Sequence, residues 1–262
     1  MPVAFERKGH VAILTLSRPS ARNAWDEDFN EGIIALCEQI ENDRDIRCAI
    51  LTGDEEGRAF SAGANLKDEN THAIHSVAEF VEGMPKARQF VSNILTNFSK
   101  PIIAAVNGYA IGIGCIATLS CDLIVASERA EWRLPQVRLG ILPAHAGAVR
   151  LARAVGKGNA MRMAMGFSID AAEAHRIGLA QWLVPHEQLM AKAMEVAEEI
   201  AAMPPLATRL VKESVNRGMD AANVTDAALV DVYRFMILQQ TEDAQEAHNA
   251  WRQQRPGVFT GR

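Results

Sequence analysis

Two glycine-containing segments carry the residue types in this chain that could do chemistry. The first runs from Phe60 to Lys67 and reads Phe-Ser-Ala-Gly-Ala-Asn-Leu-Lys, and the second runs from Val106 to Ala117. Small residues let a backbone approach a ligand closely, and glycines permit unusual dihedral angles. A helix that begins after Gly112 also leaves N–H groups unpaired at the positive end of its dipole. Both segments therefore suit the stabilisation of negative charge on an oxygen.

The run from Gly112 to Ala117 also matches the dinucleotide-binding pattern G-x-G-x-x-A. That pattern should open directly from a strand, whereas residues 107–111 intervene here. The helix also has room only until about Ser120, because Asp122 begins the next strand. The spacing thus argues against a dinucleotide site. From this motif alone, a second interpretation remains open, namely a glycine-rich helix that packs closely on a strand and binds no ligand.

The elements that must position these segments follow from hydrophobic periodicity. Apolar runs predict strands at 11–16, 48–52, 101–106, 123–126 and 179–184. Helical spacing predicts helices at 26–40, 72–99 (divided near Met84-Pro85), 187–203, 206–217, 221–239 and 242–254. Strands separated by helices indicate an α/β domain with a mainly parallel sheet. We expect a core domain over 1–200 and a helical region over 201–262, whose apolar faces would suit subunit contacts or packing on the core.

Composition narrows the classes of partner. The chain has 262 residues, a net charge of -5 and 48% hydrophobic residues, which is typical of a packed globular protein. The charge gives no reason to expect nucleic acid or an anionic membrane as partner. We see no leader peptide and no apolar stretch of membrane-spanning length. The four cysteines lie in apolar runs without metal-ligand spacing, so we expect buried free thiols, no metal site and a cytoplasmic location.

Several spaced motifs together resemble the crotonase superfamily, the enoyl-CoA hydratase/isomerase family, over nearly the whole chain. The landmarks are Arg18-Pro19 with Asn23-Ala24, Ala59 to Lys67, Lys100 to Gly108, Cys121 to Ile124, Leu139 to Pro143, and the ending from Arg255 to Arg262. The resemblance implies a spiral core of ββα units, a C-terminal helical trimerisation region and an acyl-CoA ligand. It further implies a homotrimer or a dimer of trimers, with no cofactor beyond the coenzyme A of the substrate.

The family's oxyanion hole uses two backbone N–H groups that hold the thioester carbonyl oxygen. Carried over by position, these belong to Ala64 and Ile113. A glycine is usual at the second position, but only its N–H is required, so Ile113 could donate while its bulk narrows the acyl pocket. The residues that would line the coenzyme A arm are Ala24, Ala62, Ala64, Asn65, Leu66, Lys67 and Ile113, with Arg22 and Lys67 as candidates for its phosphates or, alternatively, as solvated surface charges.

The chain departs from the family where hydration is performed. Hydratases carry two glutamates, of which one activates water and the other supplies the α-proton. Here Ile116 and Gln136 stand at those positions. Isoleucine transfers no proton, and glutamine can orient a water or a carbonyl but cannot act as a general base near pH 7. Standard hydration by this route is therefore not expected.

Another residue must then handle the proton. His145 lies where the family usually has a small Gly/Ala-rich turn facing the acyl pocket, and imidazole titrates near neutral pH. It is a candidate base, against the alternative of a histidine held by the backbone without a catalytic part. His72, His75, Glu79 and Glu82 are weaker candidates, for which a solvated helix face is the simpler interpretation.

Two hypotheses follow. The first is an acyl-CoA enzyme that stabilises a thioester enolate and has diverged from hydration, with hydrolysis, carbon–carbon cleavage, decarboxylation and isomerisation all open. The second is a catalytically silent member that binds acyl-CoA or a partner protein. A true hydratase that uses other residues is a further alternative. RNA binding, known in one branch of the family, is disfavoured because no lysine-rich helix stands out and the net charge is negative.

Overall fold

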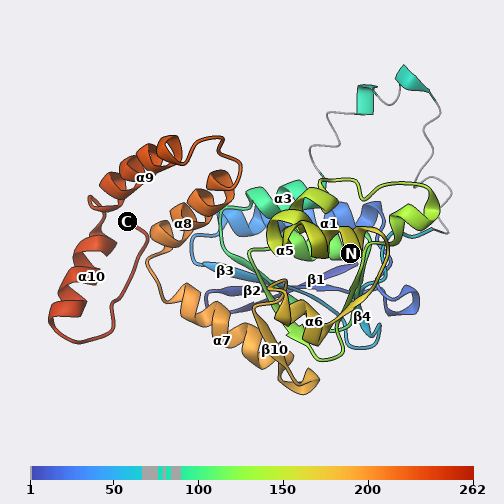
Figure 1. The fold of residues 1–262 in the computed structure, drawn as a ribbon. Coiled ribbons are helices and arrows are strands. Elements are labelled where there is room, and N and C mark those ends of the chain that lie inside the picture. The colour runs from blue at the N-terminus through green and yellow to red at the C-terminus, as the bar shows by residue number, and fades with distance from the viewer. Residues whose placement is uncertain (1, 67–75, 79–80, 84–89) are drawn as a thin grey trace.

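A six-stranded sheet forms the base of the structure, a computed structural model that describes residues 2–66, 76–78, 81–83 and 90–262 (Figure 1). All neighbouring strands are parallel except the first two, which form an antiparallel hairpin. The strands, in their order across the sheet, are β1 (Val3–Lys8), β2 (Val11–Leu16), β3 (Cys48–Gly53), β5 (Ile102–Val106), β7 (Leu123–Ser127) and β10 (Trp182–Val184).

A smaller four-stranded sheet lies beside it. Its strands, in order, are β4 (Ala59–Ser61), β6 (Tyr109–Ile111), β8 (Glu131–Arg133) and β9 (Ile169–Asp170). Strands β3, β5 and β7 of the large sheet are each followed in the chain by a strand of the small sheet and then by a helix. The chain therefore winds through successive ββα turns, which is the spiral that the family resemblance predicts.

Helices cover both faces of the large sheet. One face packs against α7 (Leu189–Ala201), and the other packs against α1 (Glu27–Asn42). In the same core, α3 (Val91–Asn97) packs against α1, and α4 (Ile113–Leu119) packs against β4 and β6 of the small sheet. Side chains of a strand alternate between faces, so a strand covered on both sides must be apolar throughout. Every residue of β3 and β5 is buried accordingly. Further helices are α5 (Gly147–Ala164) and α6 (Ala171–Arg176), with short 3-10 turns η1 (Pro19–Ala21), η2 (Pro135–Leu139) and η3 (His186–Gln188).

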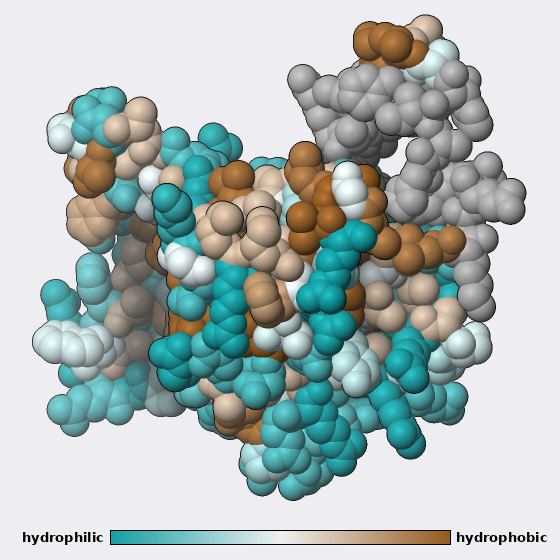
Figure 2. Space-filling view, turned by 45° about the vertical axis from the view of Figure 1, so that its right-hand side comes forward, coloured by the Kyte–Doolittle hydropathy of each residue, from teal (hydrophilic) through white to brown (hydrophobic). Residues whose placement is uncertain are grey.

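The last three helices extend away from the sheets. They are α8 (Pro205–Gly218), α9 (Val224–Leu238) and α10 (Glu242–Arg252), and Figure 1 shows them as a separate arm beyond the end of α7. Lys212 of α8 ties this arm to the core, because its ammonium lies 2.7 Å from the carboxylate of Asp122 and donates to the carbonyl of Lys100 at 2.9 Å. No residue of α9 is buried. Patches of hydrophobic surface stand among hydrophilic side chains on the face shown in Figure 2.

The predicted strands, and the predicted helices other than the one over 72–99, are confirmed with adjusted ends. The expected strand over 179–184 is shorter, because β10 covers only Trp182–Val184. The sequence did not reveal β1, which buries only Val3 and so lacks an alternating pattern, nor α5, α6 and the very short strands of the small sheet. Much of the helix expected over 72–99 lies outside the described residues. The expected buried thiols are confirmed for Cys37, Cys48 and Cys115, and burial raises the pKa of each to about 12.

Candidate active site

A cavity of about 1090 Å³ lies where both glycine segments meet the small sheet. Its walls are mainly apolar and come from parts of the chain that are far apart in sequence. The described lining residues are 25–27, 30, 62–64, 66, 90, 111–113, 116, 135–137, 139–142, 144 and 145. The cavity therefore brings together both predicted glycine segments, Gln136 and His145.

The first glycine segment is held in place by the chain that precedes α1. Trp25 and Ala64 form an isolated parallel bridge. The Trp25 N–H donates to the Gly63 carbonyl at 2.7 Å, and the Asn65 N–H donates to the Trp25 carbonyl at 2.8 Å. The Ala62 N–H also donates to the Arg22 carbonyl at 3.0 Å. These bonds leave the N–H of Ala64 itself unused.

Asn23 fixes the same region from inside. Its side chain is fully buried, accepts from the Arg18 N–H at 2.8 Å and donates to the Ala59 carbonyl at 2.9 Å. Its backbone carbonyl accepts from the Ser61 hydroxyl at 2.7 Å. Asn23 has φ of 55°, a left-handed conformation that asparagine tolerates better than most residues. The landmark Asn23-Ala24 thus has a structural reason, which is to hold the loop that presents Ala64.

The two glycine segments approach each other at Gly63 and Gly112. Both have positive φ, at 96° and 55°, which favours glycine. A Cβ on Gly112 would lie 3.8 Å from the Cα of Gly63 and 3.5 Å from Nε2 of Gln136. Gly112 is the N-cap of α4, so Ile113 supplies the first N–H of that helix. Within the described ranges, the N–H groups of Ala64 and Ile113 have no hydrogen-bond partner.

Ile116 and Gln136 both line the cavity. Ile116 is 1% exposed, and a Cβ on Gly147 would lie 2.8 Å from its Cδ1, so this side chain closes the cavity against the start of α5. Gln136 lies in η2, and its Oε1 is buried without a hydrogen-bond partner. Neither position offers a carboxylate.

His145 lies on the cavity wall, directly before α5. Its backbone has φ of 55°, and its ring stacks on that of Phe90. Burial, and secondarily the charge of Arg150, lowers the pKa of the imidazole below its ordinary value of about 6.5. Arg150 is itself held by a 2.6 Å bond to the Thr96 hydroxyl and donates to the His145 carbonyl at 3.5 Å. The imidazole is therefore neutral at pH 7 and faces the cavity.

Some of the residues predicted for the coenzyme A arm line the cavity directly, namely Ala62, Ala64, Leu66 and Ile113. Leu66 is 65% exposed. Arg22 is exposed and Ala24 half-buried just before the bridge to Ala64. Lys67 lies outside the described residues, as do His72, His75 and Glu79. Glu82 is exposed and is not a lining residue.

Five polar or aromatic lining residues were not singled out from the sequence for the site. Trp25 and Asp26 directly precede α1, and Glu27 and Asn30 lie at its start. Phe90 directly precedes α3. Asn30 is buried and accepts from the Val91 N–H at 2.9 Å, which joins the two helices. The spacing of Glu27 and Asn30 on one helix face, directly after the Asn23-Ala24 landmark, is the signal that could have found this wall.

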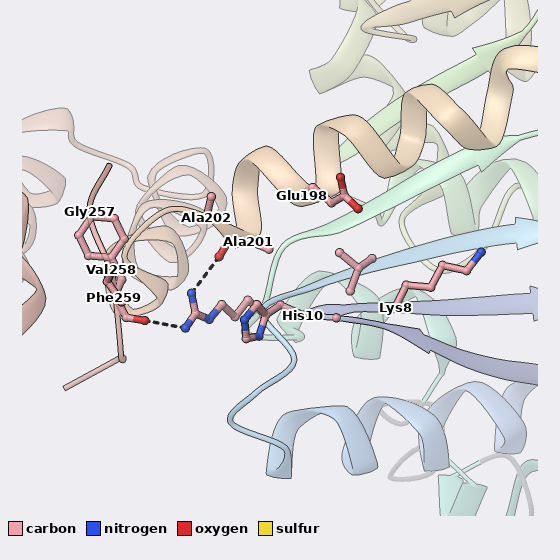
Figure 3. A pocket seen from close by; sticks show the side chains of 11 residues that line it. Lys8, His10, Glu198, Ala201, Ala202, Gly257, Val258 and Phe259 are labelled. Atoms are coloured by element: carbon pink, nitrogen blue, oxygen red, sulfur yellow. Dashed lines mark hydrogen bonds between the residues drawn. The ribbon is translucent and has the colours of Figure 1, made fainter. Parts of the chain in front are cut away.

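A second cavity, of about 570 Å³, lies between the β1–β2 hairpin, α7 and the C-terminal tail. Its lining includes Lys8, His10, Glu198 and Phe259 (Figure 3). The guanidinium of Arg47 donates hydrogen bonds there to two carbonyl oxygens, that of Ala201 at 3.1 Å and that of Phe259 at 2.6 Å. Both bonds are drawn as dashed lines in Figure 3. This cationic group therefore holds the C-terminal tail against the core. The two glycine segments border the other, larger cavity.

Among the described residues, no three His, Cys, Asp or Glu side chains come together as metal ligands would. In the same ranges, no helix has the combined length and apolar character needed to cross a membrane.

Comparison with known proteins places this chain in a family. The family model for enoyl-CoA hydratase/isomerase matches residues 6–262. The chain is 37% identical over 255 residues to the short-chain-enoyl-CoA hydratase of Clostridium acetobutylicum, covering 97% of this chain and 95% of that protein. It is 35% identical over 258 residues to the 2,3-dehydroadipyl-CoA hydratase of Escherichia coli, covering 98% and 97%.

Solved structures agree with this assignment. The crystal structure of an enoyl-CoA hydratase from Bacillus anthracis superimposes with a TM-score of 0.91 at 30% identity, over 100% of both chains. The match of the family model to almost the full length and the shared fold lead to one conclusion. This chain belongs to the enoyl-CoA hydratase/isomerase family.

Proposed function

We propose that this chain binds an acyl-CoA thioester and stabilises the enolate of its acyl group. The observation that carries the proposal is the pair of unpaired N–H groups on Ala64 and Ile113, which border one largely apolar cavity. Two such donors would hold the thioester carbonyl oxygen and strengthen their bonds as negative charge develops on it. A placed donor of this kind contributes about 3–4 kcal/mol to transition-state stabilisation.

The proton chemistry differs from two-glutamate hydration in this proposal. Loss of the α-proton converts the thioester into its enolate, and the proton passes to a ring nitrogen of His145. The neutral imidazole at pH 7 is the state that can accept it. Gln136 orients the ligand, because its amide donates and accepts hydrogen bonds but does not gain or lose a proton near pH 7. The proposed class is therefore enolate chemistry other than standard hydration.

The coenzyme A arm is assigned to the outer side of the cavity. The segment from Ala62 to Leu66 borders the cavity and reaches the surface at Leu66. We assign Arg22, Ala24, Asn65 and Lys67 to the same arm, with the two cations toward its phosphates. This orientation directs the acyl group toward Ile116, Gln136 and His145.

A catalytically silent member that only binds the thioester is the competing candidate. The specific observation in its favour is that Asp26, a carboxylate at the cavity, is engaged by the guanidinium of Arg18, so it is not free to act as a base. Both candidates predict thioester binding. Only the first predicts exchange of the α-proton.

Assembly through the C-terminal arm is part of the proposal. Helix α9 has large apolar side chains exposed on most of its surface, among them Leu229, Tyr233, Phe235 and Ile237 at 57–69% exposure. Exposed apolar area of this extent is typical of a subunit interface. We propose a homotrimer or a dimer of trimers in which another copy covers this helix.

The test is mass-spectrometric analysis of a panel of acyl-CoA thioesters, including butyryl-CoA and crotonyl-CoA, incubated with the protein in deuterated water. Deuterium at the α-carbon, or cleavage of another thioester without hydration, supports enolate chemistry. Addition of water to crotonyl-CoA at an enzymatic rate would contradict the argument from Ile116 and Gln136. Binding without any exchange would favour the silent member.

A backbone variant separates the oxyanion role from folding. Proline is well tolerated at the first position of a helix, so Ile113→Pro removes the N–H without breaking α4. We expect α-proton exchange to fall by about 10²–10³-fold in this variant. Ile113→Ala keeps the N–H and serves as the matched control. An exchange rate equal in the two variants would exclude Ile113 as a donor.

A further inference from the structure

The imidazole of His145 lies on a turn whose backbone is unusual for its residue types. His145 and Ala146 both have left-handed backbones, with φ of 55° and 60°, directly before α5. Such conformations are costly for residues other than glycine and persist only where the surrounding structure holds them. The contacts that hold this turn therefore also decide where the ring of His145 lies on the cavity wall.

Arg150, in the first turn of α5, makes several of these contacts. Its backbone N–H donates to the Ala146 carbonyl at 2.8 Å, and Nε of its guanidinium donates to the His145 carbonyl at 3.5 Å. Its Nη1 donates to Oγ1 of Thr96, in α3, at 2.6 Å. One half-buried side chain thus binds the His145 turn and α3 at the same time.

Thr96 is a fixed anchor for this guanidinium. Its hydroxyl donates to the Ser92 carbonyl at 2.8 Å, so the proton is engaged and the oxygen remains free to accept from Arg150. Its carbonyl accepts from the side-chain amide of Asn216 at 3.3 Å. Phe90, whose ring stacks on His145, is the N-cap of the same helix α3. The bond between Arg150 and Thr96 therefore joins the two helices whose starts carry the stacked rings.

We infer that Arg150 is a positioning residue for His145. It clamps the start of α5 to α3, and so holds the imidazole against Phe90. The inference rests on the proposed function, in which His145 accepts the α-proton, and adds the group that keeps this base in place. Arg150 is not among the described residues that line the cavity, so it acts on a ligand only through His145.

The charge of Arg150 acts on the same ring. Burial is the main cause of the lowered pKa of His145, and the guanidinium lowers this pKa further, because a nearby cation disfavours a second positive charge. The other charged groups beside these two residues or on the same cavity are the pair Arg153–Asp220, Asp26 engaged by Arg18, and Glu27. Loss of Arg150 should therefore be visible in the titration of His145.

The test is nuclear magnetic resonance of the full-length protein with isotope-labelled histidines, of which the chain has 7. The signal of His145 is identified by its loss in His145→Gln. Its ring-current shift reports the stacking on Phe90, and its titration gives the pKa. Neither measurement depends on turnover, so the position of the ring is tested separately from the reaction.

Three variants separate the clamp from the charge. Arg150→Met removes both, and Thr96→Val removes only the acceptor of the clamp at nearly constant shape. Arg162→Met is the matched control, because this arginine is exposed at the far end of α5 and pairs with Glu173. Thermal denaturation checks that each variant is folded.

Both variants at the clamp should loosen the stack and so reduce the ring-current shift of His145. The pKa of His145 should rise toward 6.5 in Arg150→Met and change less in Thr96→Val, which keeps the cation. For α-proton exchange of butyryl-CoA, we expect kcat to fall by about 10–100-fold in Arg150→Met while KM changes little, since displacement of a reacting group impairs chemistry more than binding. Arg162→Met should match the unaltered protein in every measurement.

The outcomes separate this inference from the function on which it rests. An unchanged ring-current shift in Arg150→Met would overturn the inference, and so would an equal change in Arg162→Met. If Arg150→Met does not fold, an unchanged shift in Thr96→Val overturns it instead. Absence of α-proton exchange in the unaltered protein would overturn the proposed function, whereas the resonance measurements would still decide whether Arg150 holds the ring.

Discussion

The imidazole of His145 stacks face to face on the phenyl ring of Phe90, with ring centroids 3.5 Å apart and an interplanar angle of 5°. The contact joins residues 55 positions apart in sequence and fixes one wall of the cavity. Because a stacked ring shields the imidazole from water, the charged form of His145 is disfavoured, in line with its lowered pKa. The neutral ring is thereby held on the cavity wall, where we propose that it accepts the α-proton.

Replacement of His145 tests its role as that acceptor. We expect His145→Gln to lower kcat/KM for α-proton exchange by about 10²–10⁴-fold, since this is the usual contribution of a positioned acid or base. The affinity for butyryl-CoA should change little, because the oxyanion donors remain. Exchange in deuterated water and titration measure the two effects. His248→Gln, at an exposed position of α10, is the control, and comparable exchange in both variants would exclude His145 as the base.

The pH dependence follows from the direction of the His145 shift. A base must be unprotonated, and the pKa of this imidazole lies below 6.5, so kcat/KM should stay level at pH 7 and decline only as pH falls through the lowered value. Phe90→Ala would expose the ring to water and raise its pKa. The decline of kcat/KM at low pH should then begin at a higher pH in this variant. A decline of kcat/KM centred at or above pH 6.5 in the unaltered protein would contradict the assignment of His145 as the base.

The ion pair between Lys212 and Asp122 should be essential for stability. Their side chains are 6% and 19% exposed, so removing one partner leaves a largely buried charge. We expect Lys212→Met to lower the free energy of unfolding by about 3–5 kcal/mol, measured by urea denaturation. The double variant Lys212→Met with Asp122→Asn should recover much of this loss, because the uncompensated carboxylate is gone. A loss below about 1 kcal/mol for the single variant would show that the pair is not effectively desolvated.

Helix α9 should determine the oligomeric state. A charge at Phe235, which is 59% exposed in the isolated chain, would be buried in the proposed interface, so Phe235→Asp should shift the mass toward a monomer. Light scattering coupled to size-exclusion chromatography measures this mass. Phe167→Asp, at a 57% exposed position after α5, tests whether any exposed phenylalanine has the same effect. A monomeric unaltered protein would contradict the proposed assembly.

The sequence by itself determined the elements that are long or strongly patterned. The runs around Ile13, Ile50 and Ile103 are apolar throughout because both faces of their strands are covered, and this pattern is visible without a structure. The glycine segments and the landmarks that point to the family were equally readable. Each depends on residue type and on spacing along the chain.

The tertiary structure alone decided how distant segments meet. Strands such as β4 and β6 span three residues, too few for a period to be recognised, and they form only because partner strands supply their hydrogen bonds. The cavity wall formed by Trp25, Phe90, Gln136 and His145 likewise depends on tertiary contacts. These residues carry no common motif, and their proximity results from the winding of successive ββα turns. The sequence thus specified the two glycine segments, whereas three-dimensional packing determined which side chains complete the cavity.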